Sequence, residues 1–114
     1  MSQFVEFLDE VFETFGEITV RKMFGGYGVY HQGIMFALVA DDQLYLKVDQ
    51  STRHKFEEKG LSAFQYQKND KQVNMSYFLA PEEIYDDKEQ AAQWAAVAFG
   101  VAKNRKRPKR KVKQ

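Results

Sequence analysis

The uninterrupted apolar run from Ile34 to Ala40 constrains the fold of this chain more than any other feature. His31-Gln32-Gly33 precedes the run and Asp41-Asp42-Gln43 follows it, and both segments predict tight turns. Seven apolar residues between two turns predict a strand that is buried on both of its faces. In a chain of 114 residues, helices would cover one face, and a second subunit is the candidate for the other. The run therefore predicts the centre of an antiparallel sheet and a homodimer.

Alternating apolar residues on both sides of this run predict further strands. The segment 44–49 alternates strictly, with Leu44, Leu46 and Val48 on one face. Residues 17–24 and 27–31 predict two earlier strands, and the glycines between and within them predict a bulge or a close backbone approach. Two more strands, at 63–67 and 73–79, are expected to form a hairpin across a polar turn.

Helical spacing and capping residues predict two helices before the last strands. The first begins after Ser2 and ends at Gly16. A shorter helix begins after Ser51, has Phe56 as its only strongly apolar residue and ends at Gly60.

The last helix is expected to begin after Asp86 or Asp87. From 91 to 102 its sequence is apolar except at Gln93 and Gly100, which predicts burial on more than one side and again indicates a dimer. Together these elements predict an α+β fold in two layers. An antiparallel sheet of about five to six strands carries the helices, in the order α-β-β-β-β-α-β-β-α. Residues 1–102 are expected to form this single domain.

The composition excludes several classes of protein. The absence of cysteine excludes disulfides, thiolate nucleophiles and zinc-cysteine sites. The N-terminus lacks a signal-peptide pattern, and no apolar run is long enough to span a bilayer. We expect a cytoplasmic protein with no membrane contact.

Basic residues are concentrated at the C-terminus. Residues 1–102 hold nine Lys and Arg against all sixteen Asp and Glu, a net charge of −7, whereas residues 103–114 carry +8. We expect a disordered basic tail that binds phosphates without reading base edges. The alternative is a solvated tail that only adds solubility. The candidate nucleic-acid-binding residues are Lys103, Arg105, Lys106, Arg107, Lys109, Arg110, Lys111 and Lys113.

The predicted sheet offers a second set of nucleic-acid contacts. Arg21, Lys22 and Lys47 would add a basic strip if they shared a face. Exposed tyrosines would stack on bases, although partly buried sheet positions are the alternative for them. The tyrosines concerned are Tyr27, Tyr30, Tyr45 and Tyr66.

The residue patterns do not predict catalysis, a cofactor or a metal. Gly26-Tyr27-Gly28 resembles the start of a dinucleotide-binding motif, but His31 occupies the place of the third glycine and a strand follows instead of a helix. His31 and His54 predict exposed side chains without a second metal ligand at a characteristic spacing. The serines and the two histidines do not combine into a nucleophile–base set. We therefore expect a protein that is not an enzyme.

Three runs of the sheet region occur together: RKMFGGYGVY at 21–30, GIMFALV at 33–39 and LYLKVD at 44–49. With the helix around Trp94, they resemble the N-terminal domain of the TfoX/Sxy family of bacterial competence regulators, over residues 3–103. The resemblance implies a two-layer α/β fold, dimers, and transcriptional regulation of DNA-uptake genes together with the cyclic-AMP receptor protein. It supplies no catalytic residues. The residues of its most specific run, to which we assign a structural role, are Met23, Phe24, Gly25, Gly26, Tyr27 and Gly28.

Three functions remain open at this point. The first is a dimeric regulatory domain acting through protein contacts and DNA. The second is a nonspecific nucleic-acid binder that uses residues 103–113. The third is a small-ligand binder or an enzyme with a cleft around Phe24 to Tyr30.

Overall fold

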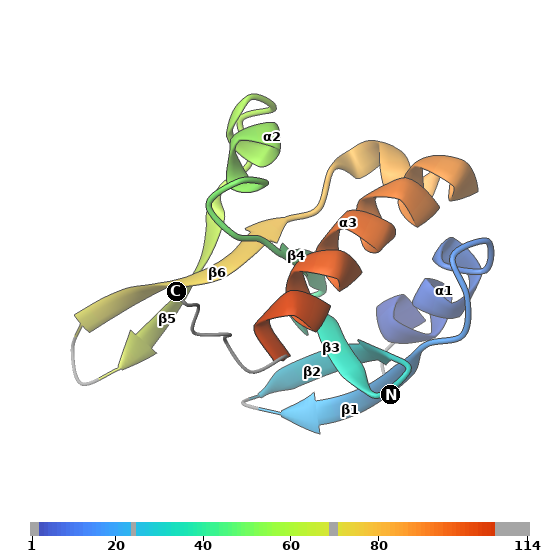
Figure 1. Ribbon diagram of the computed structural model, residues 1–114. Helices are drawn as coiled ribbons and strands as arrows, with labels where there is room; N and C mark the ends of the chain where they lie inside the picture. Colours follow the sequence, from blue (N-terminus) through green and yellow to red (C-terminus); the bar gives the residue numbers. More distant parts are fainter. Residues whose placement is uncertain (1–2, 24, 69–70, 107–114) are drawn as a thin grey trace.

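The structure, a computed structural model, describes residues 3–23, 25–68 and 71–106. Within these residues, six strands form one antiparallel sheet in the order β1-β2-β3-β4-β6-β5, and α1 and α3 pack on one side of it (Figure 1). The predicted α+β class and order of elements are confirmed, with one short 3₁₀ helix, η1, in addition. The elements are α1 (Gln3–Val11), β1 (Thr19–Met23), β2 (Gly26–His31), β3 (Ile34–Ala40), β4 (Gln43–Lys47), α2 (Arg53–Glu57), β5 (Ala63–Lys68), β6 (Lys71–Leu79), η1 (Glu82–Tyr85) and α3 (Lys88–Lys106).

The two hairpin turns beside β3 form as predicted. The backbone φ angles of Gln32 and Gly33 are 53° and 80°, and those of Asp41 and Asp42 are 52° and 57°. Two successive positive φ angles are typical of the tight turns whose twist matches that of antiparallel strands. These turns place the central run between β2 and β4.

A bulge in β3 sets which side chains face the helices. Val29 pairs with Ala37 and Tyr30 pairs with Met35, so Phe36 is the extra residue. Phe36 and Ala37 are both fully buried, and the ring of Phe36 lies 5.6 Å from that of Phe12 beside α1. Two neighbouring residues therefore point toward the helices, as a bulge allows and regular alternation does not.

The other face of β3 differs from its prediction. Met35 and Leu38 point away from α1 and α3, and within the described residues no helix covers them. Leu38 is nearly buried, at 9% exposure, whereas Met35 is only half-buried. Burial on both faces is thus achieved only in part within one chain, and a second subunit as the other cover remains a prediction.

The last helix begins as predicted and ends later. The carboxylate of Asp87 accepts the backbone N–H groups of Glu89 and Gln90 at 3.0 and 3.2 Å, which caps α3. The helix continues beyond the predicted end at Ala102 as far as Lys106. Residues 107–114, and with them Arg107, Lys109, Arg110, Lys111 and Lys113, lie outside the described residues.

One face of α3 packs on the sheet. Ala91, Ala95 and Ala98 are buried at 1% exposure or less, because small side chains let the helix approach the strands closely. Ala96, on the other apolar face, is exposed. Burial of α3 on a second side therefore remains a prediction, which concerns an assembly of more than one chain.

Two other helix ends differ from the sequence predictions. The helix α1 ends at Val11, and a turn carries Phe12 into the core before Gly16, whose φ is +145°. Thr52, not Ser51, occupies the position before α2, and its side chain makes no capping bond. The turn that precedes α2 is held instead by the carboxylate of Asp49, as described below.

Tyr85 supplies a prediction about stability at high pH. Burial, reinforced by the nearby Glu82, raises the pKa of Tyr85 to about 12, against a hydrogen bond with the Leu44 backbone that lowers it. The folded pKa lies above the ordinary value of 10.0, so this group stabilises the fold fully below about pH 10. That contribution is lost as the pH rises through about 12. Urea unfolding between these pH values should show a steeper loss of stability in the native chain than in Tyr85→Phe. Equal slopes would contradict the assignment.

Candidate functional site

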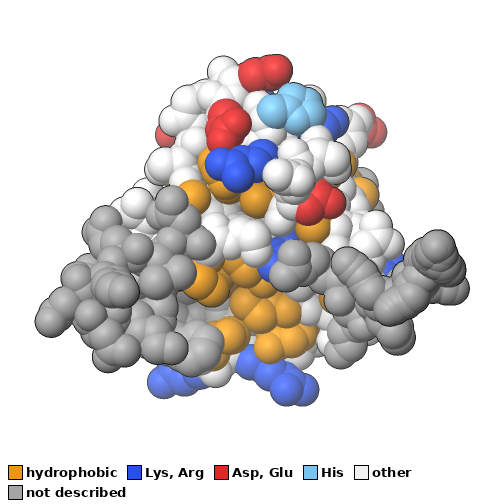
Figure 2. Space-filling model, turned by 60° about the vertical axis from the view of Figure 1, so that its left-hand side comes forward, with side chains coloured by type: hydrophobic (Ala, Val, Ile, Leu, Met, Phe, Trp, Pro, Cys, Tyr) orange, Lys and Arg blue, Asp and Glu red, His pale blue; other side chains and the backbone are white. Residues whose placement is uncertain are grey.

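A hollow of about 390 Å³ lies on the side of the sheet that faces away from α1 and α3. We call this side the open face; Met35, Leu38 and Tyr45 define it. Residues of all six strands line the hollow, and its surface is mainly apolar. An apolar area bordered by Lys and Arg side chains is visible in Figure 2. The side chains that shape the hollow are those of Met23, Met35, Leu38, Phe64, Met75 and Tyr77.

A glycine gives the methionines their place on the open face. A Cβ at Gly28 would lie 2.7 Å from the sulfur of Met23 and 3.1 Å from that of Met35, so the missing side chain makes room for both thioethers. With Met75, which is 36% exposed, three of the four methionines in the chain line this hollow. Methionine is flexible and polarisable, which suits a surface that adapts to a bound molecule.

The charged residues of the sheet are cationic. The six strands contain no Asp or Glu, although the chain has sixteen of them. On the open face, the guanidinium of Arg21 lies 5.4 Å from the centre of the Tyr30 ring. The ammonium of Lys47 lies 4.7 Å from the Tyr77 ring and donates to the hydroxyl of Ser76 at 2.7 Å. The open face thus has an apolar centre with cationic groups beside aromatic rings.

The C-terminal end of α3 reaches the margin of the open face. A shallow hollow there is lined by Tyr30, Met35, Lys47 and Tyr77 together with Ala102 of the helix. The basic segment predicted from the sequence begins at the next residue, Lys103, whose ammonium lies 5.8 Å from the Phe99 ring. The fold therefore starts the basic segment beside the cations of the sheet.

Comparison with known proteins decides the family. The model of the TfoX N-terminal domain matches residues 10–102, most of the chain. The chain belongs to the TfoX N-terminal domain family. Over 63 residues it is also 35% identical to DNA transformation protein TfoX1 of Aliivibrio fischeri (strain ATCC 700601 / ES114), a match that covers 55% of this chain and 30% of that protein. The chain thus spans less than a third of that relative, and the resemblance inferred from the sequence is confirmed at the level of the family.

The glycine-rich run of this TfoX N-terminal domain shapes the sheet. Gly25 has a φ of +76° at the turn after β1, and a Cβ at Gly26 would lie 2.1 Å from the carbonyl oxygen of Val39. Tyr27 packs against the core on the helix side and also lines the hollow. Phe24 lies outside the described residues. Gly26 and Tyr27 line the hollow, which therefore overlaps the cleft predicted for a small ligand around Phe24 to Tyr30.

The histidines of the TfoX N-terminal domain lie apart. The prediction of an exposed His31 is wrong: its ring lies 4.5 Å from Phe15 and 4.8 Å from Phe99, and its Nδ1 lies 2.7 Å from the carbonyl oxygen of Glu17. Phe15 and Phe99, which lie on the helix side of the sheet and are distant from His31 in sequence, cover its ring. His54 is exposed on α2, as predicted. Among the described residues, no three His, Asp or Glu side chains form a group that could hold a metal ion.

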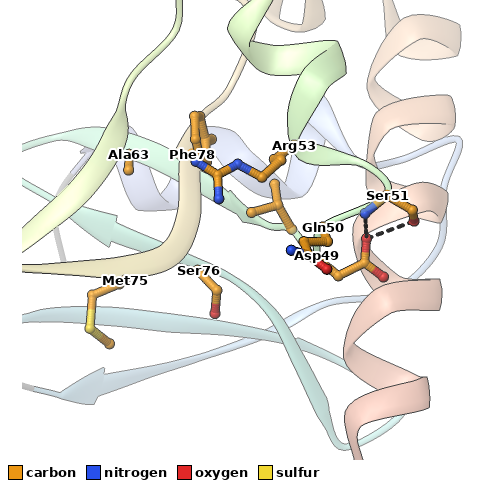
Figure 3. A pocket seen from close by; sticks show the side chains of 9 residues that line it. Asp49, Gln50, Ser51, Arg53, Ala63, Met75, Ser76 and Phe78 are labelled. Atoms are coloured by element: carbon orange, nitrogen blue, oxygen red, sulfur yellow. Dashed lines mark hydrogen bonds between the residues drawn. The ribbon is translucent and has the colours of Figure 1, made fainter.

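A second hollow, of about 630 Å³, lies between α2 and β6 (Figure 3). Its carboxylate, Asp49, accepts the backbone N–H groups of Ser51 and Thr52 at 3.0 Å and the hydroxyl of Ser51 at 2.8 Å. Burial alone would raise the pKa of Asp49, but these hydrogen bonds outweigh it and lower the pKa. Arg53 binds Glu57 at 3.0 Å and lies over the Phe78 ring. These groups hold the start of α2 and do not converge on a common point in Figure 3.

The described part of the TfoX N-terminal domain also bears on membrane contact. None of its helices is both long and apolar enough to cross a bilayer.

The sequence predicted the basic segment and the glycine run, but it did not predict the hollow. The positions of Met23, Met35 and Met75 in the sequence were the only signal for this hollow. That signal was insufficient, because the three side chains share a face only through the pairing of distant strands.

Proposed function

We propose that this chain is a non-enzymatic regulatory domain in the control of DNA transformation, acting by contact with other macromolecules. The open face is the observation that carries the proposal: it is apolar, lined by methionines, bordered by cations, and not covered by any described helix. Surfaces of this kind are typical of binding sites. In the larger hollow, the hydroxyl of Ser51 donates to the carboxylate of Asp49, and both groups hold the turn before α2.

Family membership supports the regulatory part of the proposal. The relative from Aliivibrio fischeri is named a DNA transformation protein. The resemblance to competence regulators adds transcriptional control, the cyclic-AMP receptor protein as a partner, and a homodimer. A site of action in the cytoplasm is part of this proposal.

A chimera tests this proposal. The chain would replace the matched segment of the Aliivibrio fischeri protein in a strain that lacks its own copy, and transformation frequency and DNA-uptake transcripts would be measured. The chimera should restore both, and Met35→Glu should lower them at least about tenfold, because a carboxylate in the apolar hollow opposes contact. Gln93→Glu, which adds the same charge on the exposed side of α3, is the matched control and should leave both unchanged. A chimera that restores neither would contradict the proposal.

A second candidate function is nonspecific binding of nucleic acid through the basic C-terminal segment. The concentration of eight cations after Ala102 favours it, as does the continuation of α3 to Lys106. The corresponding experiment is given in the Discussion.

A further inference from the structure

We infer that the open face binds single-stranded nucleic acid, with bases stacked on Tyr45 and Tyr30 and phosphates held by Arg21 and Lys47. The inference rests on the contact role proposed above for the open face and names the molecule that occupies it. It differs from binding by the basic segment alone, because it assigns the bases a place on the sheet.

Aromatic rings border the hollow on two sides. Tyr45 of β4 pairs with Leu38, and its ring lies 5.0 Å from that of Phe64 on β5. Tyr30 of β2 pairs with Met35 and lines the shallow hollow at the margin of the open face. Tyr30, Tyr45 and Phe64 are all partly exposed. Every base has a π-face, so rings arranged in this way stack on single strands with little preference for sequence.

The charges of the sheet suit the phosphates. Lys47 lines the hollow, Arg21 lies on the same face of the sheet, and the strands contain no carboxylate. An opposing group is Asp41 in the turn before β4, which acts electrostatically on Tyr45. We therefore place the phosphates toward Arg21 and Lys47 and a base at Tyr45.

The shape of the hollow favours a single strand over a duplex. In a duplex the bases are already stacked on one another, so a convex double helix offers the sheet mainly its phosphates. A single strand can insert an unstacked base into an apolar space of about 390 Å³. Lys47 at the hollow and Arg21 on the same face favour a polyanion over an apolar protein segment.

Fluorescence anisotropy of the full chain with labelled oligonucleotides tests the inference. The probes are oligothymidylate and oligouridylate of about 16 nucleotides and a DNA duplex of the same length. The single strands should bind at least about tenfold more tightly than the duplex. Tyr45→Ala should weaken single-strand binding about five- to a hundredfold, whereas Tyr45→Phe, which keeps the ring, should not. Neither substitution should change duplex binding. Tighter binding of one single strand identifies DNA or RNA as the ligand, and either result supports the inference.

Several results would overturn the inference. Equal binding of single strand and duplex, or an unchanged affinity in a Tyr45→Ala protein that melts like the native chain, would remove the bases from the open face. If light scattering shows that Met35→Glu converts a dimer to a monomer, the open face is an interface between copies of the chain. If single strands do not bind while Met35→Glu still lowers transformation, the inference fails and the proposed function stands. If single strands do not bind and Met35→Glu does not lower transformation, both the inference and the proposed function fail.

Discussion

Replacing Gly26 with alanine is expected to destabilise the domain by about 3 kcal/mol or more. The added Cβ would lie 2.1 Å from the carbonyl oxygen of Val39, a backbone atom that belongs to the centre of the sheet. A flexible side chain could move aside, but Val39 is 3% exposed and its strand is paired with both β2 and β4. Because a small domain is stable by only about 5 to 15 kcal/mol, this loss should lower the melting temperature by about 10 °C or more.

Two neighbouring glycines provide matched controls for this prediction. Gly25→Ala meets no atom within 4 Å but must adopt a φ of +76°, which costs about 1 to 2 kcal/mol. Gly28→Ala meets the sulfur of Met23 at 2.7 Å, and a thioether can rotate away, so the change should narrow the hollow more than it lowers stability. Thermal unfolding followed by circular dichroism would rank the three variants. A Gly26→Ala protein that melts like the native chain would refute the close approach of β2 and β3.

Neutralising the basic C-terminal segment is expected to lower the affinity for duplex DNA by several orders of magnitude at low salt. If all eight cations contact phosphates, the slope of log affinity against log salt is about −7. The native chain would then lose about 10⁴-fold in affinity between about 50 and 200 mM salt. Replacement of all eight by glutamine should bring the slope close to zero. The residues replaced are Lys103, Arg105, Lys106, Arg107, Lys109, Arg110, Lys111 and Lys113.

The controls for this prediction separate contact from general charge. Lys55→Gln removes a cation from the exposed surface of α2 and should leave the slope unchanged. Unfolding curves of the neutralised chain should match those of the native chain, because Lys103 is exposed and lies beyond the buried turns of α3. A native slope near zero would mean that the segment is solvated and does not hold duplex DNA.

Local patterns in the sequence were sufficient for the order of the elements. The alternation predicted that Leu44, Leu46 and Val48 share one face, and all three are buried at 3% exposure or less. Such patterns succeed because side chains in strands and helices repeat over two to four residues, within reach of the sequence itself.

Predictions that depended on distant contacts succeeded less well. Periodicity extended the first helix past Val11, but the chain turns there so that Phe12 can pack against Phe36. An exposed side chain was predicted for His31 because nothing near it in sequence covers it. In the fold, Phe15 and Phe99 cover it. In both cases the deciding partner lies more than fifteen residues away.

The sequence by itself determined the class of the fold, its turns, the family, and the charge of the C-terminal segment. Only the tertiary structure decided that Met23 and Met35 meet over Gly28, that Met75 lines the same hollow, and that Ala102 of α3 lies beside Lys47 of the sheet. The physical reason is that the bulge at Phe36 and the pairing of six strands set which residues share a face. The open face exists because the described helices cover the other side of the sheet, and neither fact can be read from neighbouring residues.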